Sequence, residues 1–387
     1  MVRFIRHLII GAGIPGLYIA LQLQREGEND FLLLEKRGVD RGKQVTQIAP
    51  DGTDIELGSS IEHTNQPKFF DLLNLLDLEK AVWFTPKLTN YYVYGNLSSD
   101  QVKQIYKDCK KRVKAASEKI ENQFATLEEL SQKVLSESEF KLFSTCYCCW
   151  YEINLENAKH FFITEANEGK YFRLKGGQQQ LITLSDEKVG SHIKFYTEVV
   201  KVKYDGKHYF TTTADGETIA SEYLYLTTNL TGAKKIKFDG IDAIEKYLDL
   251  AWSRECMRWY MVLKKGKGIN IPGYIVGQIP GKWTIKNSDR VWLISYVDGP
   301  LVEEYSKNKN LSREWIFTMN SLFGTRIKAE DVEDEIVAVW KDAYTILKPE
   351  WYKYHKIIED ELPSKLVITT VTTPEGQGWI EGNLRKI

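Results

Sequence analysis

Three glycines and one acidic residue near the amino terminus have the types and spacing of a dinucleotide-binding site. The glycines are Gly11, Gly13 and Gly16, and the acid is Glu35. In this pattern the first glycine permits a tight turn, the second lets the backbone approach a pyrophosphate, and the third lets a helix pack closely on a strand. A carboxylate about twenty residues after the last glycine is placed to accept hydrogen bonds from a ribose.

The segments around these residues fit the same prediction. Apolar runs over residues 4–10 and 31–34 predict two buried strands, and an apolar helix begins between them at Ile14 and Pro15. The N-terminus of that helix would present its positive dipole end to phosphates. A glycine-rich turn of some other α/β protein is the main alternative. A secretory signal peptide is rejected, because three glycines and a proline interrupt the apolar run and the second strand completes a βαβ unit.

The composition argues against several kinds of binding partner, namely nucleic acid, a membrane and a metal ion. The 387 residues carry a formal net charge of −1 without a basic stripe, which gives no electrostatic footprint for nucleic acid. No apolar run is long enough to span a bilayer. The 21 Tyr, 16 Phe and 10 Trp suit large apolar interiors or a pocket for a flat ligand. Five cysteines, with three of them at Cys146, Cys148 and Cys149, fit neither a disulfide framework nor a zinc site, so we expect buried thiols, no metal and a cytoplasmic location.

Further patterns organise the rest of the chain. Residues 98–145 have a polar helical pattern with capping residues at Ser98 and Thr126, which indicates a helical insertion that is either a solvated cover for the core or a partner-binding surface. The other expected helices lie over residues 69–78, after the glycine pair at 176–177, and over 313–322. A hairpin is expected over 51–61, and strands over 193–204, 207–213, 222–228, 257–263, 291–297, 336–340 and 366–370.

Six motifs in this order resemble the flavin-containing amine oxidase superfamily, which includes monoamine, polyamine and L-amino-acid oxidases. They lie at residues 11–16, 34–36, 56–61, 175–177, the strand of Val199, and 378–382. The resemblance covers the whole chain and implies an α/β fold, in which an FAD-binding Rossmann-like domain of the GR2 type carries an inserted mixed α+β substrate domain. The implied FAD-binding segments are 1–66, 170–236 and 363–387, and the implied substrate-domain segments are 67–169 and 237–362.

The resemblance also implies a cofactor and the residues that hold it. The cofactor would be non-covalent FAD, because no cysteine follows Cys256 to form the C-terminal thioether of some relatives. The residues expected to contact FAD are Gly11, Gly13, Ile14, Pro15, Gly16, Glu35, Lys36, Gly42, Lys43, Gly58, Ser59, Ser60, Val199, Trp379 and Ile380.

Three residues are candidates for the reaction itself. By resemblance, Trp379 forms one wall of an aromatic cage over the flavin and Tyr344 the other, although Tyr344 is equally compatible with an ordinary core tyrosine. Arg258 falls where relatives have a lysine that positions a water near flavin N5, and a guanidinium cannot act as a base near neutral pH. Two other departures are Lys43 in place of an arginine and Val371 in place of an acid that holds the ribityl chain.

Three functions remain open at this point. The first is an FAD-dependent oxidase that transfers a hydride from a CH–NH group of an amine to flavin N5 and is reoxidised by dioxygen. The second is a flavin oxidoreductase acting on a porphyrinogen or polyene. The third is a non-enzymatic protein that binds or formerly bound FAD and has a structural or interaction role. Whichever function holds, the expected partners are a small-molecule substrate, most simply an amine, and a homo-oligomer or larger assembly. The abundance of lysine and isoleucine suggests an AT-rich genome such as that of a large DNA virus, which would allow a virion-associated location.

Overall fold

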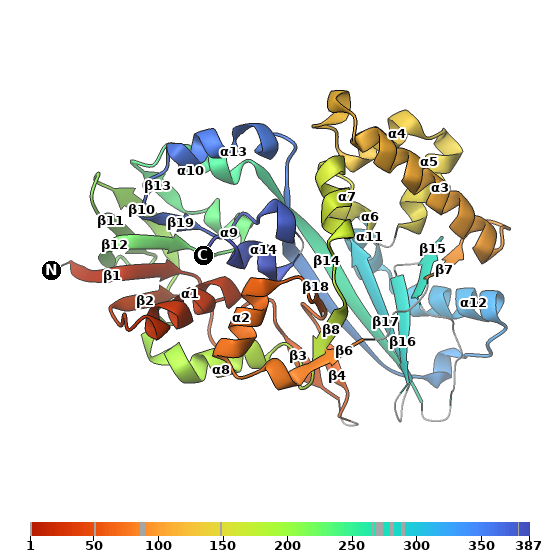
Figure 1. Cartoon of the computed structure of the whole chain (residues 1–387). Coiled ribbons are helices and arrows are strands. Elements are labelled where there is room, and N and C mark those ends of the chain that lie inside the picture. The colour runs from red at the N-terminus through yellow and green to blue at the C-terminus, as the bar shows by residue number, and fades with distance from the viewer. Residues whose placement is uncertain are drawn as a thin grey trace.

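The computed structural model describes residues 2–49, 52–85, 90–147, 149–264, 267, 274–278, 282–287, 291–377 and 379–387. Figure 1 shows two lobes, which the long strands β14 (Ala251–Leu263) and β18 (Val332–Leu347) connect. The first lobe lies around β1 and contains both described ends of the chain, and the second carries the helical insertion.

The first lobe is built on an eight-stranded sheet with the order β13-β10-β11-β12-β1-β2-β9, in which β19 also pairs with β12. Its central strands β1, β2, β12 and β19 pair in parallel. The strands are β1 (Arg3–Ile10), β2 (Phe31–Leu34), β9 (Ile193–Lys194), β10 (Val199–Tyr204), β11 (Tyr209–Thr213), β12 (Thr218–Leu226), β13 (Lys237–Asp239) and β19 (Leu366–Ile368). This mixed α/β architecture with a Rossmann-like βαβ unit confirms the predicted fold class.

Helices cover both faces of this sheet, because residues on its buried strands alternate between two apolar cores. Ile9 packs on one face, and Leu8 and Ile10 pack on the other. The first core includes residues of α1 (Ile14–Arg25), α2 (Pro67–Leu75), α8 (Gln180–Val189) and α14 (Ile380–Leu384). The second includes residues of α9 (Leu230–Ala233), α10 (Ala243–Leu248) and α13 (Trp351–Asp360). Helices α10 and α13 pack on this sheet although they lie outside the three predicted FAD-binding segments. The boundaries of those segments stay a prediction.

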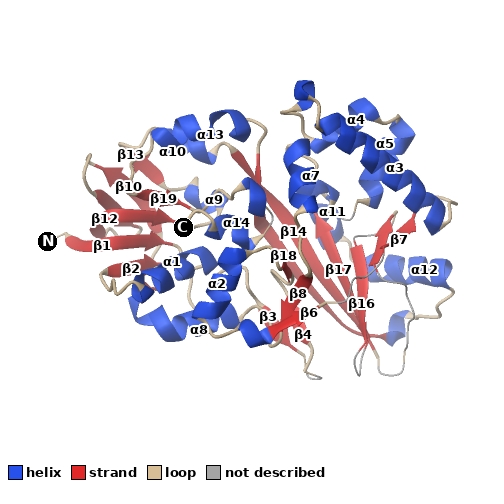
Figure 2. Cartoon of the chain, viewed as in Figure 1, coloured by secondary structure: helices blue, strands red, loops and turns tan. Residues whose placement is uncertain are grey.

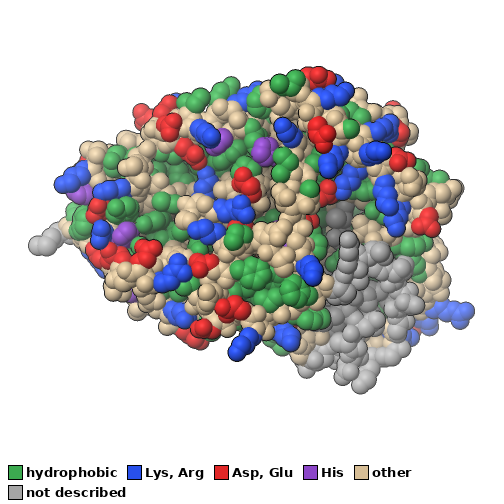
Figure 3. Space-filling model, in the orientation of Figure 1, with side chains coloured by type: hydrophobic (Ala, Val, Ile, Leu, Met, Phe, Trp, Pro, Cys, Tyr) green, Lys and Arg blue, Asp and Glu red, His purple; other side chains and the backbone are tan. Residues whose placement is uncertain are grey.

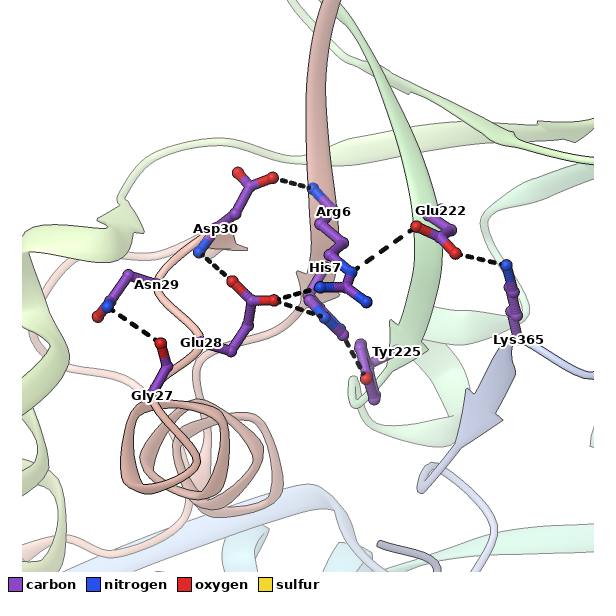
Figure 4. A network of polar contacts seen from close by, with 9 residues as sticks. All are labelled: Arg6, His7, Gly27, Glu28, Asn29, Asp30, Glu222, Tyr225 and Lys365. Carbon is purple, nitrogen blue, oxygen red and sulfur yellow. Dashed lines mark hydrogen bonds and ion pairs between the residues drawn. The ribbon is translucent and has the colours of Figure 1, made fainter.

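A polar network beside β1 joins three parts of the chain that are far apart in the sequence, namely β1, β12 and the segment before β19 (Figure 4). Arg6 pairs with Glu28 at 2.8 Å and with Glu222 at 3.7 Å, and Glu222 also pairs with Lys365 at 2.5 Å. Partly exposed ion pairs of this kind stabilise a fold only weakly. The network therefore records where β1, β12 and the segment before β19 meet, while the apolar cores supply the stability.

The second lobe contains a six-stranded sheet with the order β18-β14-β17-β16-β15-β7 (Figure 2). Its shorter strands are β7 (Asn90–Val93), β15 (Tyr274–Gly277), β16 (Lys282–Asn287) and β17 (Val291–Asp298). On one face Met257 and Trp259 share a core with α11 (Leu301–Lys307) and α12 (Leu311–Phe323). On the other face Tyr260 and Val262 pack against Ile55 of the first lobe. The face that carries Tyr260 is therefore turned toward the predicted cofactor site.

The predicted helical insertion is present, with the expected caps. Ser98 accepts a hydrogen bond from the backbone N–H of Gln101, and Thr126 accepts one from that of Glu129, each in a reciprocal capping box. Its helices are α3 (Ser99–Ser117), α4 (Leu127–Val134), α5 (Glu137–Cys146), α6 (Trp150–Ile153) and α7 (Ala158–Ala166). Two small sheets pair β3 (Thr46–Ile48) with β4 (Asp54–Glu56), and β8 (Tyr171–Leu174) with β5 (Glu62–His63) and β6 (Val82–Phe84). The 3-10 turns are η1 (Glu79–Ala81), η2 (Ile120–Asn122), η3 (Gly190–His192), η4 (Ala329–Asp331) and η5 (Pro374–Gly376).

The prediction of a continuous strand over residues 193–204 is wrong. The structure has two strands there, because β9 pairs with β2 whereas β10 pairs with β11 and β13. Between them Tyr196 adopts a left-handed backbone with φ of 55°, which breaks the extended conformation. Alternation of apolar and polar residues does not reveal such a change of pairing partner.

Charged side chains of both signs are interspersed over the face drawn in Figure 3. Among the described helices, none is long and apolar enough to cross a membrane.

Candidate functional site

The glycine turn at the end of β1 has the geometry that its sequence predicts. Gly11 has φ of 107°, and a Cβ added to Gly16 would lie 2.1 Å from the carbonyl oxygen of Gly11, so helix and strand could not pack as closely with any other residue. A Cβ added to Gly13 would meet nothing nearer than about 4 Å, where the closest backbone is that of Gly42. The space in front of Gly13 can therefore admit a pyrophosphate.

Glu35 lies at the carboxyl end of β2, where a ribose-binding acid is expected. Its side chain is buried, and its two oxygens accept hydrogen bonds from the backbone N–H groups of Ala12 at 2.9 Å and Arg37 at 2.8 Å. A carboxylate has about four acceptor sites, so both oxygens keep the capacity to accept a hydroxyl. This arrangement fits the ribose of a dinucleotide.

The basic residues after Glu35 have partners within the protein. Arg41 is fully buried, where its Nε donates to the carbonyl of Ala12 at 2.7 Å and its Nη1 to Asp186 at 3.0 Å. Lys36 pairs with Glu198 at 2.5 Å on the surface. The amine of Lys43 donates to the carbonyl of Ala343 in the second lobe at 2.7 Å, and burial lowers its pKa. The contacts of Lys36, Gly42 and Lys43 with FAD stay predictions.

We call residues 58–60 the cofactor loop, since the resemblance places them beside FAD. A Cβ added to Gly58 would lie 1.8 Å from the carbonyl oxygen of Lys43, so only glycine fits there. The hydroxyl of Ser60 accepts a hydrogen bond from Nη2 of Arg258 at 2.8 Å. Next to the loop, Nε1 of Trp340 donates to the carbonyl of Leu57 at 2.6 Å. The cofactor loop is therefore held between the first lobe and strands β14 and β18.

Polar side chains gather on the face of the second sheet that meets the cofactor loop. Arg258 is directly opposite Tyr296, and Cys256 is opposite Asp298, so all four share one face. The guanidinium of Arg258 lies 4.9 Å from the ring centre of Tyr296. On the neighbouring strand, burial raises the pKa of Tyr344 well above its usual value, which keeps its hydroxyl a neutral donor.

Among the described residues, the buried polar atoms of this face without a hydrogen-bond partner include the hydroxyl of Tyr344 and Nε of Arg258. Buried polar groups are nearly always paired in native proteins, because an unpaired group has lost its water without replacement. A bound polar ring or substrate next to Ser60 would supply partners for both atoms. The donor set therefore fits a flavin and its substrate at this position.

Trp379 lies just before α14, and its ring meets two other aromatic rings. Its centroid is 4.8 Å from that of His63, edge to face, and 6.2 Å from that of Tyr171, stacked. Among the described ring contacts, none joins Trp379 to Tyr344. The aromatic cage of these two residues stays a prediction, as does the contact of Ile380 with FAD, and Gly378 of the same motif lies outside the described residues.

Glu62 and His63 are residues of this region that the motifs did not predict. Nδ1 of His63 accepts hydrogen bonds from the backbone N–H groups of Asn65 at 3.2 Å and Gly169 at 3.4 Å, which leaves the proton on Nε2. Burial lowers the pKa of His63 to about 4, so the imidazole is neutral. The available signal was a pair of ionisable residues directly after Ile61, at the end of the predicted hairpin over residues 51–61.

The remaining residues that the sequence singled out, Val199, Val371 and the cysteines, lie mostly within the protein interior. Val199 is buried at the start of β10, where the register with β11 shifts, and its contact with adenine stays a prediction. Val371 is fully buried in the core of the first lobe. Cys109, Cys146 and Cys256 are buried free thiols and Cys149 is half-buried, while Cys148 lies outside the described residues. Within the described ranges, no group of three or more His, Cys, Asp or Glu side chains could hold a metal ion.

Two family models match different parts of the chain. Residues 9–76 match the NAD(P)-binding Rossmann-like domain, and residues 93–246 match the flavin containing amine oxidoreductase. No curated protein matches the sequence.

The fold is similar to those of solved amine oxidases over nearly their whole length. A double mutant of putrescine oxidase, redesigned for cofactor binding, is 14% identical with a TM-score of 0.78, and the match covers 100% of this chain and 98% of that chain. Wild-type putrescine oxidase bound to putrescine has the same identity of 14%, a TM-score of 0.73 and coverages of 100% and 98%. Cyclohexylamine oxidase from Brevibacterium oxydans is 15% identical with a TM-score of 0.72, and the match covers 99% and 96% of the two chains. The two family matches and the geometry of the glycine turn therefore indicate a Rossmann-like dinucleotide-binding unit followed by a region similar to flavin containing amine oxidoreductases, and the chain as a whole has the fold of solved amine oxidases.

Proposed function

We propose that the chain is an FAD-dependent oxidase of amines. The observation that carries the proposal is the meeting of the two lobes at the cofactor loop, where Ser60 of the first lobe is bonded to Arg258 of the second. The unpartnered hydroxyl of Tyr344 on the same sheet face gives this junction a free polar group for a ligand. The similarity to putrescine oxidase and cyclohexylamine oxidase supports an amine as the substrate.

The first lobe would bind the cofactor through its backbone. The open space at Gly13 and the N–H groups at the start of α1 would hold the pyrophosphate, and Glu35 would accept from the ribose. The cofactor loop and Trp379 would flank the ring. When bound, FAD supplies the redox chemistry, taking a hydride from the carbon next to an amine nitrogen and passing two electrons to dioxygen.

The second lobe would place the amine. Arg258 stays protonated at any physiological pH, so it cannot remove a proton from the substrate. Hydride transfer from an amine needs a lone pair on nitrogen, and the substrate must therefore reach the site as the neutral amine. Arg258, Tyr344 and Trp379 would orient it and exclude water, which is the role we assign to these three residues in the reaction.

A flavin spectrum and an anaerobic amine panel test the proposal. The purified protein should be yellow, and mixing it anaerobically with putrescine, cyclohexylamine and longer amines should bleach the flavin absorbance. Bleaching by a porphyrinogen with none by any amine would favour the second function that the sequence leaves open. A protein that binds FAD but is reduced by no member of either panel would contradict an oxidase.

The Glu35→Ala variant serves as the cofactor control. It removes the ribose acceptor and the partners of Ala12 and Arg37, so FAD should be lost on gel filtration. Unchanged flavin occupancy in this variant would contradict the ribose assignment. A viral origin, a cytoplasmic or virion-associated location and assembly into an oligomer remain predictions, the last of which light scattering on the purified protein would test.

A further inference from the structure

Strand β18 forms one edge of the six-stranded sheet and is 16 residues long (Figure 2). Within the described residues it pairs only with β14. The other edge of this sheet is the four-residue strand β7, where the backbone N–H of Tyr92 donates to the hydroxyl of Ser99 on α3 at 2.9 Å. Strands β9 and β13, at the ends of the eight-stranded sheet, have two and three residues. A long edge strand offers unpaired N–H and C=O groups to any strand that approaches it.

The helices that cover this sheet leave β18 largely exposed. On β14, Met257 and Trp259 are 0% and 1% exposed, in the core that they share with α11 and α12. Directly opposite them on β18, Val339 and Val337 are 42% and 52% exposed. Two apolar side chains on one face of the edge strand are therefore in contact with water.

The backbone of β18 also directs hydrogen-bonding groups toward this edge. The carbonyl of Glu255 on β14 accepts from the N–H of Gly299, next to β17, at 3.0 Å. Because bonding groups alternate along a strand, the odd-numbered residues of β14 here bond to β17 and the even-numbered ones bond to β18. Their partners on β18 are even-numbered as well, so odd-numbered residues such as Val337 direct their N–H and C=O groups outward. In agreement, the N–H of Glu335 is bonded to the side chain of Asp334 at 2.8 Å.

The exposed edge is complementary to an antiparallel copy of itself. The pairing with β14 shifts register on both sides of residues 334–340, and Val337 is the midpoint of that regular stretch. Acidic residues 333–335 lie at one end of it and Lys341 at the other, and all four side chains are exposed. Antiparallel pairing would bring each Lys341 beside the acidic end of the other copy, whereas parallel pairing would bring like charges together.

We propose that β18 is the surface through which two copies of this chain form a dimer, by antiparallel pairing about a two-fold axis at Val337. Glu335 of each copy would face Val339 of the other, which gives about six backbone hydrogen bonds once Asp334 releases the N–H of Glu335. The exposed valines of both copies would form one apolar patch. Charges often protect an edge strand from pairing, but here opposite charges would meet across the two-fold axis.

Sedimentation velocity of the purified protein between about 1 µM and about 200 µM tests this surface, since a contact through one strand is small and the dimer should be weak. The wild type should change from one chain to two within that range. Val337→Pro removes an outward N–H and leaves the ladder with β14 intact, so the variant should fold. Its dimer should be weaker by at least about tenfold.

Charge reversal tests the antiparallel arrangement. Lys341→Glu should weaken the dimer by at least about tenfold, because like charges would meet at both ends of the interface. Adding Glu333→Lys to this variant should restore the affinity to within about threefold of the wild type. The matched control is Lys356→Glu, which makes the same change of charge at an exposed lysine of α13 in the first lobe and should leave the dimer unchanged.

A wild type that stays monomeric over the whole range would overturn the inference. So would a dimer that is as strong in Val337→Pro or in Lys341→Glu as in the wild type, an equal loss in Lys356→Glu, or a loss in Lys341→Glu that Glu333→Lys does not restore. If Val337→Pro does not fold, as judged by circular dichroism, the charge variants alone decide. The measurement needs neither bound FAD nor an amine, so failure of the proposed function would not affect its outcome.

Discussion

The side-chain amine of Lys43 donates a hydrogen bond to the carbonyl of Ala343 at 2.7 Å, joining the loop after the predicted ribose acid to strand β18. The amine is half-buried, and this burial lowers its pKa. Lys43→Met should lower the free energy of unfolding by about 1–2 kcal/mol, the cost of leaving a partly buried carbonyl without its charged donor.

Urea denaturation with Lys36→Met as the control checks this effect. Lys36 carries the same charge seven residues earlier, but its pair with Glu198 is exposed, so the control should leave the unfolding midpoint nearly unchanged. Equal effects of the two variants would mean that the contact between Lys43 and Ala343 contributes nothing to stability.

Two glycines of the same turn should respond differently to alanine. In Gly16→Ala the new methyl group would lie 2.1 Å from the carbonyl oxygen of Gly11, so the variant should be strongly destabilised or fail to fold. In Gly13→Ala the methyl group meets nothing nearer than about 4 Å, and the fold should persist. If FAD lies in front of Gly13, that variant should still lose at least about tenfold in cofactor affinity, because the backbone can no longer approach the pyrophosphate.

Thermal unfolding measures the stability of both variants, and titration with FAD measures their affinity for the cofactor, so an effect on the fold can be told from an effect on binding. A Gly13→Ala protein that is stable and binds FAD like the wild type would place the pyrophosphate elsewhere.

The hydroxyl of Tyr344 should matter for the ligand and hardly at all for the fold. It is buried and has no hydrogen-bond partner within the described ranges, so Tyr344→Phe should change the free energy of unfolding by no more than about 0.5 kcal/mol. The control is Tyr18→Phe, which removes a hydroxyl bonded to Asp71 at 2.7 Å and should cost about 1–2 kcal/mol. With an active enzyme, steady-state kinetics should show a lower kcat/KM only for Tyr344→Phe. If kcat/KM of Tyr344→Phe equals that of the wild type, the hydroxyl of Tyr344 does not contact the substrate and Tyr344 is an ordinary core residue.

His63 should make the fold sensitive to acid. The pKa of His63 is lowered to about 4 in the native protein, compared with about 6.5 in the unfolded chain. Between these values the unfolded state binds more protons, so stability rises with pH there and is lost as the pH falls from about 6.5 to about 4. The lost contribution is roughly 3 kcal/mol.

His63→Gln should remove this slope, since a glutamine does not titrate. Urea denaturation of both proteins at several pH values gives the difference in their free energies of unfolding. Other titrating groups affect both proteins equally, so their contribution cancels in this difference. A wild type whose stability relative to His63→Gln is constant across this range would show that His63 keeps an ordinary pKa.

Sequence patterns predicted the parts of the site that are local in the chain. The strand, glycine turn, helix and second strand that place Gly13 and Glu35 lie within one short segment, so periodicity and residue type were sufficient. The partners of Lys43 and Glu62 could not be predicted in this way, because Ala343 and Gln178 are far away in the sequence and become neighbours only in the folded chain. The break at Tyr196 was missed for a related reason, since it depends on which strand pairs with which and not on local propensity.

The first lobe draws β19 and α14 from residues 366–384, and these pack against elements that are synthesised earlier, β19 against β12 and α14 against α1 and α2. During translation the first lobe consequently lacks these two elements until residues 366–384 leave the ribosome. We therefore expect the cofactor to load only after residues 366–384 have emerged. Nascent chains arrested before β19 should emerge without bound flavin, however long the pause.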